Sequence, residues 1–172
     1  MLAEPGSRQV QSVHTAFRIV ELLQDLDGAK MNELAAHMDL AKSTVHNYLG
    51  TLESLGYGVE RDGSYRLGLR FLTNGMAARN GHPLGASLPP VLRAVCQELG
   101  HSVWWLVEEQ GRGIFVEREA PDGDAPIYGR VGKRSYLHTH APGKAILARW
   151  PDDAVRALAE HEGLPAQTRE SL

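Results

Sequence analysis

The spacing of hydrophobic residues near the start of the chain predicts a helix over residues 12–26. Ser12 is expected to cap its start, and Asp27 with Gly28 is expected to end it. Four apolar residues recur at helical spacing and are expected to face the core: Val13, Phe17, Val20 and Leu23.

Two further helices are predicted over residues 31–38 and 42–55. The first should bury Leu34, Ala35 and Met38, and the second should bury Val45, Leu49 and Leu52. The opposite face of the second helix carries small or hydrogen-bonding side chains and almost no acid, since only Glu53 lies near its edge. Such a face suits an approach to phosphates and base edges, although a surface helix that is merely poor in acids has the same pattern. Its members are Ser43, His46, Asn47, Gly50, Thr51 and Ser54.

A β-hairpin is predicted directly after these helices. Residues 59–61 and 64–67 alternate as strands, and the Asp62-Gly63 pair between them is the strongest short hairpin signal. Three helices followed by a hairpin make a winged helix-turn-helix. Arg61 and Arg66 are expected to flank the hairpin tip, where a wing would meet phosphate, although two solvated strand arginines would read the same way.

The second half of the chain predicts an α+β unit. Leu69, Leu72 and Met76 give helical spacing to a linker segment that Gly81-His82-Pro83 ends, and this stripe is apolar enough to be buried against a second copy. Residues 102–109 and 113–120 read as an antiparallel strand pair, and residues 127–131 as a third strand. A helix over residues 84–99 precedes them, with five residues expected on its inner side: Leu88, Val91, Leu92, Val95 and Leu99.

Composition places the chain among cytoplasmic globular proteins. Its 172 residues are 42% hydrophobic, with no apolar run long enough for a membrane span and a polar N-terminus. The single cysteine, Cys96, cannot close an internal disulfide. The net charge is −3, and the first 68 residues hold six basic and nine acidic side chains. Any binding to DNA must therefore come from geometry rather than from bulk charge.

The run LAKSTVHNYLGTLESLGYGVERDGSYRLG resembles the DNA-binding domain of IclR-family transcriptional regulators. The resemblance implies that Ser43, Thr44 and His46 face DNA and that Lys42 lies beside the phosphates. Asn47 stands where the family usually has arginine, which alters the expected base preference, because asparagine reads adenine. The residues expected to bind DNA are Lys42, Ser43, Thr44, His46, Asn47, Thr51, Arg61 and Arg66.

The segment GKRSYLHTHAPGKAILA, residues 132–148, resembles the family motif that lies against the effector pocket. It implies a small organic acid held near backbone amides at Gly143 and Lys144, the start of a helix. Tyr136 replaces the usual proline, and His140 replaces the usual threonine or serine. The residues expected to bind effector are Tyr128, Gly132, Arg134, His138, Thr139, Ala141 and Gly143.

The resemblance also implies an order of domains and a mode of action. We expect a tail over residues 1–11, a winged helix-turn-helix over 12–68, a linker helix over 69–83, and the N-terminal half of a GAF-like α+β effector domain over 84–172. The protein would bind operator DNA as a dimer or tetramer, without a cofactor. Because the family usually continues well beyond this length, we expect a truncated chain whose sensor is minimal or incomplete.

Other functions have less support in the sequence. His138 and His140, with His82, His101 or Cys96, lack the paired spacing of a zinc site, so no metal is expected. A small hydrolase using His138 and Cys96 is one alternative, and a winged helix that binds protein instead of DNA is another. Salt dependence distinguishes the DNA-binding from the protein-binding winged helix, since DNA binding weakens steeply as salt rises and an apolar protein interface does not.

Overall fold

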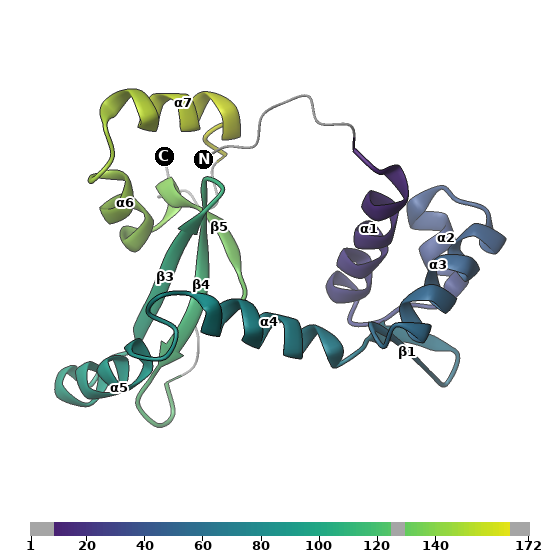
Figure 1. Cartoon of the computed structure of the whole chain (residues 1–172), viewed down its shortest axis with the longest axis horizontal. Coiled ribbons are helices and arrows are strands. Elements are labelled where there is room, and N and C mark those ends of the chain that lie inside the picture. Colours follow the sequence, from purple (N-terminus) through teal and green to yellow (C-terminus); the bar gives the residue numbers. More distant parts are fainter. Residues whose placement is uncertain (1–8, 125–129, 166–172) are drawn as a thin grey trace. The chain divides into compact units, whose positions relative to one another are not determined.

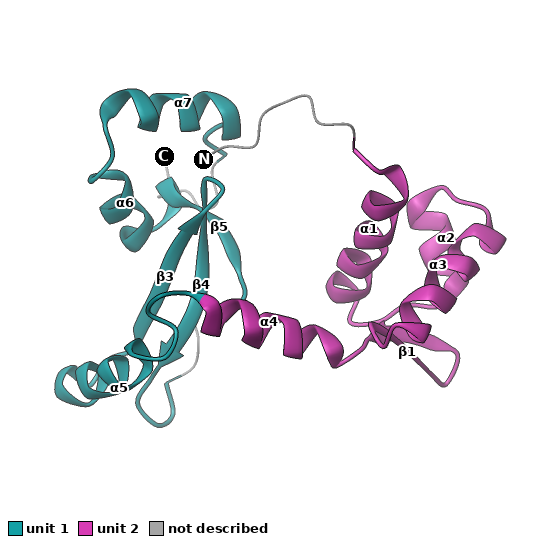
Figure 2. Cartoon of the chain, in the orientation of Figure 1, with its two compact units in different colours: residues 1–5, 82–172 teal, residues 6–81 magenta. Residues whose placement is uncertain are grey.

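The computed structural model of the chain describes residues 9–124 and 130–165, and it divides into two compact units (Figures 1 and 2). The first unit along the chain, magenta and labelled unit 2 in Figure 2, ends at Gly81, and the second, teal and labelled unit 1, begins at His82. Each unit is described by itself.

The first unit is a winged helix-turn-helix followed by one more helix, as the sequence predicts (Figure 1). The two short strands form an antiparallel pair in which Arg61 lies opposite Ser64. Asp62 and Gly63, with φ of 53° and 75°, make the two-residue turn between them, and glycine is favoured there because its φ is positive. The elements are α1 (Gln11–Asp25), α2 (Met31–Met38), α3 (Lys42–Ser54), β1 (Gly58–Arg61), β2 (Ser64–Leu67) and α4 (Arg70–Gly81).

The core of this unit lies where α1, α2 and α3 meet. Leu34, Val45 and Leu49 are buried there, as predicted, together with Ile19 and Leu23 of α1. Because three helices contribute large aliphatic side chains to one cluster, the unit has its own hydrophobic core.

The predicted inner face of α1 is partly wrong: Leu23 is buried and Val20 is half-buried against the core, as predicted, but the other two residues are not. Val13 and Phe17 are 52% and 56% exposed, whereas Ile19, which was not predicted to face the core, is buried. The predicted Ser12 cap is also wrong, because the helix begins at Gln11 and no side chain caps it.

The second unit is an α+β fold built on a three-stranded antiparallel sheet in the order β3-β4-β5. Helix α5 contacts β3 and β4, and α6 follows directly on the short helix η1. The elements are α5 (Leu88–Leu99), β3 (Val103–Glu109), β4 (Arg112–Glu119), β5 (Arg134–Tyr136), η1 (Leu137–Thr139), α6 (Ala141–Leu147) and α7 (Asp152–Glu162).

Helix α5 is shorter than predicted, and part of its predicted inner face is exposed. It begins at Leu88, with prolines in its first turn, where the missing N–H costs nothing. Leu92 and Cys96 are buried, whereas Val91 and Leu99 are 53% and 58% exposed.

The third strand lies later in the chain than predicted. Residues 127–129 are outside the described residues, and Arg130 and Val131 are not in a strand. Gly132 donates from its amide to the Phe115 carbonyl at 2.7 Å, and the pairing with β4 continues into β5. Strand β5 has only three residues, too few to show alternation in the sequence, and it is recognised by its pairing with β4.

The sequence analysis did not predict α7. Its start follows Pro151 and carries Asp152 and Asp153, a pattern typical of a helix N-terminus. Arg112 of β4 forms an ion pair with Glu162 of α7, and its guanidinium lies 3.5 Å from the centre of the Tyr136 ring. These contacts hold α7 against the sheet. Across the part of the chain that the structure describes, no helix is both long and apolar enough to cross a membrane.

Candidate DNA interface and sensor segment

Helix α3 has one buried face and one exposed polar face, as predicted. Val45, Leu49 and Leu52 pack inward. Thr44 is half-buried, and the Thr51 hydroxyl donates to the Asn47 carbonyl at 2.7 Å, so its hydrogen is already used within the helix. The remaining predicted contact residues of this helix are exposed: Lys42, Ser43, His46 and Asn47.

The only acid of α3 is turned toward the wing. The Glu53 carboxylate accepts a hydrogen bond from the Glu60 amide at 3.1 Å. It therefore joins α3 to β1 and occupies the edge of the polar face rather than its centre. The middle of the exposed face carries no negative charge.

The two wing arginines occupy different places. Arg61 is exposed beside the turn, as predicted. The prediction for Arg66 is wrong, because it pairs with Val59, two residue pairs away from the tip. Its guanidinium lies 3.3 Å from the Asp27 carboxylate, after α1. An acid within reach draws this side chain toward the body of the unit.

Helix α4 is held to the winged helix by contacts that the sequence analysis missed. Arg70 donates to the Leu55 carbonyl at 2.6 Å, and the Phe71 and Tyr57 rings are 4.7 Å apart. The Asn74 amide donates to the Tyr57 hydroxyl at 2.7 Å. Residues 70, 71 and 74 share one face of a helix, and their spacing in the sequence could have predicted that this face packs on the winged helix.

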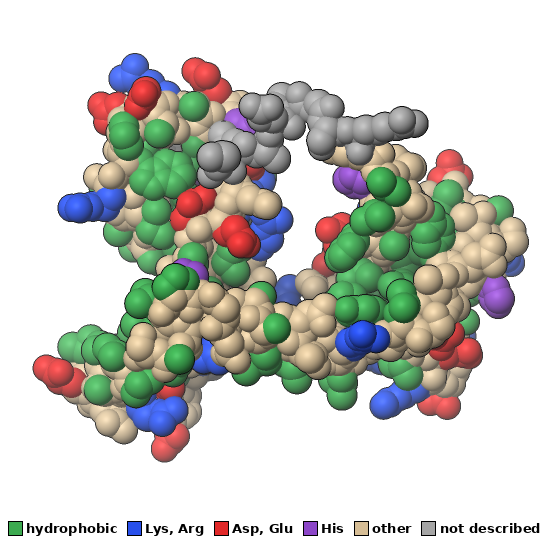
Figure 3. All heavy atoms as spheres, viewed as in Figure 1, with side chains coloured by type: hydrophobic (Ala, Val, Ile, Leu, Met, Phe, Trp, Pro, Cys, Tyr) green, Lys and Arg blue, Asp and Glu red, His purple; other side chains and the backbone are tan. Residues whose placement is uncertain are grey.

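The opposite side of α4 presents apolar side chains to solvent. Leu69, Leu72 and Met76 are 83%, 62% and 42% exposed, and no residue of α4 is buried. Figure 3 shows hydrophobic side chains along the surface of this helix. We call these three residues the linker stripe.

The start of α6 does not offer the free amides that the sequence analysis expected. The Gly143 amide donates to Nδ1 of His140 at 3.0 Å, and the Lys144 amide donates to the His140 carbonyl at 3.0 Å. Gly143 is buried, and a Cβ there would collide with the Leu137 carbonyl. This glycine therefore allows close packing of α6 on η1.

His140 caps α6 and links it to the sheet. The Gly143 amide can only donate, so Nδ1 must be unprotonated and Nε2 must carry the hydrogen. Nε2 lies 2.7 Å from the hydroxyl of Ser135, which donates to the Gly113 carbonyl at 3.2 Å. Burial lowers the pKa of His140, and the charges of Lys133 and His138 lower it further. This neutral histidine cannot accept a proton from Ser135, so the pair is a structural link and not a nucleophile with its base.

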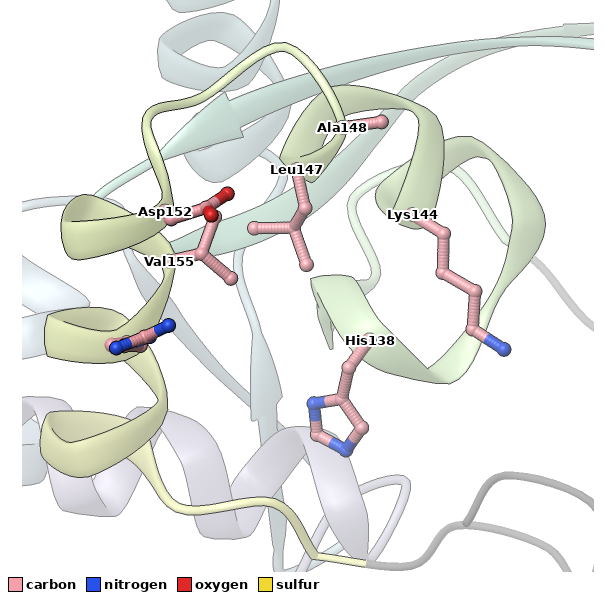
Figure 4. A pocket seen from close by; sticks show the side chains of 7 residues that line it. His138, Lys144, Leu147, Ala148, Asp152 and Val155 are labelled. Atoms are coloured by element: carbon pink, nitrogen blue, oxygen red, sulfur yellow. The ribbon is translucent and has the colours of Figure 1, made fainter.

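Two cavities lie between η1, α6 and α7. The larger, of about 390 Å³, has Leu147 and Val155 facing each other, with His138 and Lys144 on the α6 side and Asp152 on the α7 side (Figure 4). Arg156 and Ala148 complete its lining. A smaller cavity of about 160 Å³ runs from Tyr136 to Leu164.

The structure brings only one of the predicted effector residues into these cavities. His138 lines both, and its Nε2 lies 3.2 Å from the Pro165 carbonyl. The Thr139 hydroxyl donates to the Tyr136 carbonyl at 2.7 Å. Tyr128 lies outside the described residues. The others line neither cavity: Gly132, Arg134, Thr139, Ala141 and Gly143.

The alternatives of a metal site and a hydrolase gain no geometric support. Within residues 9–124 and 130–165, no three His, Cys, Asp or Glu side chains gather in a way that would hold a metal ion. Cys96 is buried in α5, and His138 lies on η1 beside Pro165.

Two family models match the chain over nearly its whole length. The IclR helix-turn-helix domain matches residues 12–63, and the bacterial transcriptional regulator IclR C-terminal domain matches residues 76–172. The chain belongs to the IclR family of transcriptional regulators. Members of this family are regulators and not enzymes, which sets the hydrolase alternative aside.

Curated relatives of the IclR family match most of the chain. The transcriptional repressor IclR of Escherichia coli is 27% identical over 173 residues, covering 98% of this chain and 63% of the relative. The regulator KipR of Bacillus subtilis is 26% identical over 156 residues, covering 90% of this chain and 62% of the relative. The chain therefore spans about three fifths of the length of these relatives.

Solved structures of the IclR family share the fold. An IclR regulator from Alicyclobacillus acidocaldarius has a TM-score of 0.76 at 26% identity, over 96% of this chain and 68% of that one. An IclR homologue from Microbacterium hydrocarbonoxydans, complexed with 4-hydroxybenzoate, has a TM-score of 0.77 at 20% identity, over 93% of this chain and 67% of that one. The similarity to the Microbacterium hydrocarbonoxydans structure, at 20% identity, shows a shared fold alone.

Proposed function

We propose that this IclR-family chain binds operator DNA through the exposed face of α3 and regulates transcription. The observation that carries the proposal is the acid-free polar face of α3 within a helix-turn-helix that matches the family. His46 and Asn47 are exposed on that face, and Glu53 is held at its edge by the Glu60 amide. Imidazole and amide groups can pair with base edges in the major groove, whereas a carboxylate there would repel phosphate.

The proposed phosphate contacts lie at the two ends of this surface. Lys42 is exposed at the start of α3, where helix polarity also attracts an anion. Arg61 is exposed beside the hairpin turn. Arg66 lies farther from the turn and its guanidinium contacts Asp27, so we assign Arg61 the main role in the wing.

The test is a selection of duplexes from a random-sequence DNA pool by the unaltered chain. Enrichment of a defined sequence supports the proposal. Enrichment of no sequence contradicts it, and salt-independent capture of protein partners would then favour the winged helix as a protein-binding module.

We further propose that the chain acts as a dimer whose copies meet through the linker stripe. One recognition helix reads few base pairs, so two copies at half-sites roughly 34 Å apart, or a multiple of it, would give useful specificity. The exposed side chains of Leu69, Leu72 and Met76 support this proposal, because contiguous apolar surface on a connecting helix is a common mark of an interface.

We propose a small organic acid as the effector class, held near the sensor segment of residues 132–148. Lys144, Arg156 and His138 around the larger cavity supply positive or hydrogen-bonding groups for a carboxylate, and Leu147 and Val155 supply an apolar wall. These side chains replace the amides at Gly143 and Lys144, which are already bonded. The homologue that was crystallised with 4-hydroxybenzoate makes aromatic acids useful probes.

A thermal-shift screen of small aliphatic and aromatic carboxylic acids tests the effector proposal. We expect at least one acid to raise the melting temperature of the unaltered chain, and His138→Ala to abolish that rise. Arg134→Ala is the matched control, because Arg134 lies in the same segment but lines neither cavity. A screen in which no acid shifts the melting temperature would contradict the proposal.

A further inference from the structure

Gly50 lies in the middle of the exposed face of α3, and nothing within the chain accounts for a glycine there. It is the ninth residue of a helix of 13 residues, a position where glycine is less stable than alanine. Its backbone is not among the residues with positive φ. A Cβ placed on Gly50 would meet no atom within 4 Å.

Two other glycines of the chain have an evident structural reason. A Cβ on Gly68 would collide with the Gly56 carbonyl, and a Cβ on Gly143 would collide with the Leu137 carbonyl. In both cases the fold itself fills the space. At Gly50 that space is open, as it is at Gly75 of α4, and what sets Gly50 apart is its place on the face of α3 that we propose meets DNA.

The space beside Gly50 lies over the residues proposed to read bases. Gly50 follows His46 by four positions and Asn47 by three, so the three are neighbours on the helix surface. Side chains on a helix lean toward its N-terminus, so a side chain at position 50 would cover the turn that carries His46 and Asn47. Glycine leaves both of these side chains uncovered.

We propose that Gly50 is the point at which α3 comes closest to double-stranded DNA, and that its missing side chain lets Asn47 and His46 reach base edges. Glycine is used where a backbone must approach a ligand closely. The inference rests on the proposed function of α3. It adds a residue that sets how deeply the helix enters the major groove.

The experiment measures binding of the full chain to the duplex that it enriches from a random pool, and to a scrambled duplex of equal length. The variants are Gly50→Ala and Gly50→Leu, both of which favour a helix, so folding is not at risk. Gly75→Ala is the matched control, because Gly75 is also an exposed glycine inside a helix with no atom within 4 Å of its Cβ position. Melting temperatures and light scattering check the fold and the oligomeric state of every variant.

We expect Gly50→Ala to melt at the same temperature or a few degrees higher and to bind the enriched duplex roughly tenfold more weakly, the cost of losing one good base contact. Gly50→Leu should bind still more weakly. The affinity of Gly50→Ala for the scrambled duplex should fall less, because phosphate contacts dominate binding to a duplex without the recognised sequence. Gly75→Ala should show the same gain in melting temperature and unchanged DNA affinity.

Three outcomes would overturn the inference. If the unaltered chain enriches no sequence, the proposed function fails and the inference fails with it. If a sequence is enriched and Gly50→Ala binds it as tightly as the unaltered chain does, the inference alone fails. It also fails if Gly75→Ala weakens DNA binding as much as Gly50→Ala does, because the effect would then not depend on position 50.

Discussion

Asn47 and Arg61 are both exposed and polar, yet their places in the fold give them different roles in recognition. Asn47 lies on the polar face of α3, where an amide can form two hydrogen bonds to adenine. Arg61 lies beside the wing turn, where a guanidinium meets phosphates that carry no sequence information. Substitutions at the two residues should therefore differ in kind.

Replacing Asn47 by alanine should relax base preference at one position of the site and cost about 1–3 kcal/mol of binding free energy there. Replacing Arg61 by alanine should weaken binding to all duplexes alike and reduce the salt slope by about one. Binding titrations against duplexes with single base changes separate the two effects. Equal losses on every duplex for Asn47→Ala would contradict its role as a base reader.

His140 makes the second unit sensitive to pH. Its pKa is lowered by burial and by neighbouring positive charge, below the ordinary value of 6.5. In the unfolded chain the imidazole binds a proton near pH 6.5, whereas in the folded chain it stays neutral to lower pH. The free energy of unfolding should therefore be fully retained above pH 6.5 and should decrease as the pH falls from 6.5 through the lowered pKa.

His140→Thr should flatten this part of the pH profile, because a threonine hydroxyl also accepts the capping hydrogen bond but does not titrate. His140→Ala should lower the free energy of unfolding by about 1 kcal/mol at pH 7, the usual effect of losing a helix cap. Denaturant titrations of each variant from pH 5 to pH 8 make the comparison. A pH profile of His140→Thr identical to that of the unaltered chain would show that another group is responsible.

At the scale of elements, α4 combines a fixed face with an apolar one. Arg70, Phe71 and Asn74 hold it to the winged helix, and the linker stripe lies on its other side. If the stripe is the dimer interface, then α4 fixes the winged helix of each copy close to the two-fold axis. Such an arrangement would set the spacing of the two recognition helices.

Leu72→Glu should convert dimers into monomers, because it places a charge in the middle of the stripe. Ala78→Glu is the matched control, since Ala78 is exposed on the same helix but away from the stripe. Light scattering at several protein concentrations gives the mass of each variant. An unaltered chain that is already monomeric would refute the dimer proposal.

The elements that sequence predicted well are those whose signal is local. Asp62-Gly63 fixes the hairpin turn, and Val45, Leu49 and Leu52 specify the buried face of α3 without reference to the rest of the fold. Which side of α1 is buried depends on which neighbours cover it, so Val13 and Phe17 were assigned to the core although both are exposed.

In the candidate site, sequence identified the segment but not its contacts. Strand β5 was missed because backbone pairing with β4 makes it, and the bonding of the Gly143 amide to His140 follows from a rotamer that sequence does not specify. The two-residue turn at Asp62-Gly63 already puts Arg66 opposite Val59, so its distance from the tip could have been predicted, whereas its ion pair with Asp27, which is distant in sequence, could not. Long-range pairing of this kind requires the folded structure.

At the scale of the whole chain, the two units correspond to the two domains of the IclR family. The first contains the proposed recognition helix, and the second contains the proposed sensor segment. A ligand in the sensor unit can alter DNA binding only by the difference in its affinity for the two states of the protein. Regulation by an organic acid therefore requires that the acid changes the DNA affinity of the full chain. The DNA titration can be repeated in the presence of the acid that raises the melting temperature, and the dissociation constant for DNA should then change. An unchanged dissociation constant would show that acid binding in one unit does not affect DNA binding by the other.

The most direct test of the central claim is a salt titration of DNA binding by the unaltered chain. Its affinity for the enriched duplex and for a scrambled duplex of equal length would be measured by fluorescence anisotropy from low to physiological salt. We predict that both affinities fall linearly on a log–log plot as salt rises, and that the enriched duplex stays about 10³-fold or more tighter throughout. Equal affinity for the two duplexes, or binding that does not change with salt, would contradict recognition of DNA by α3.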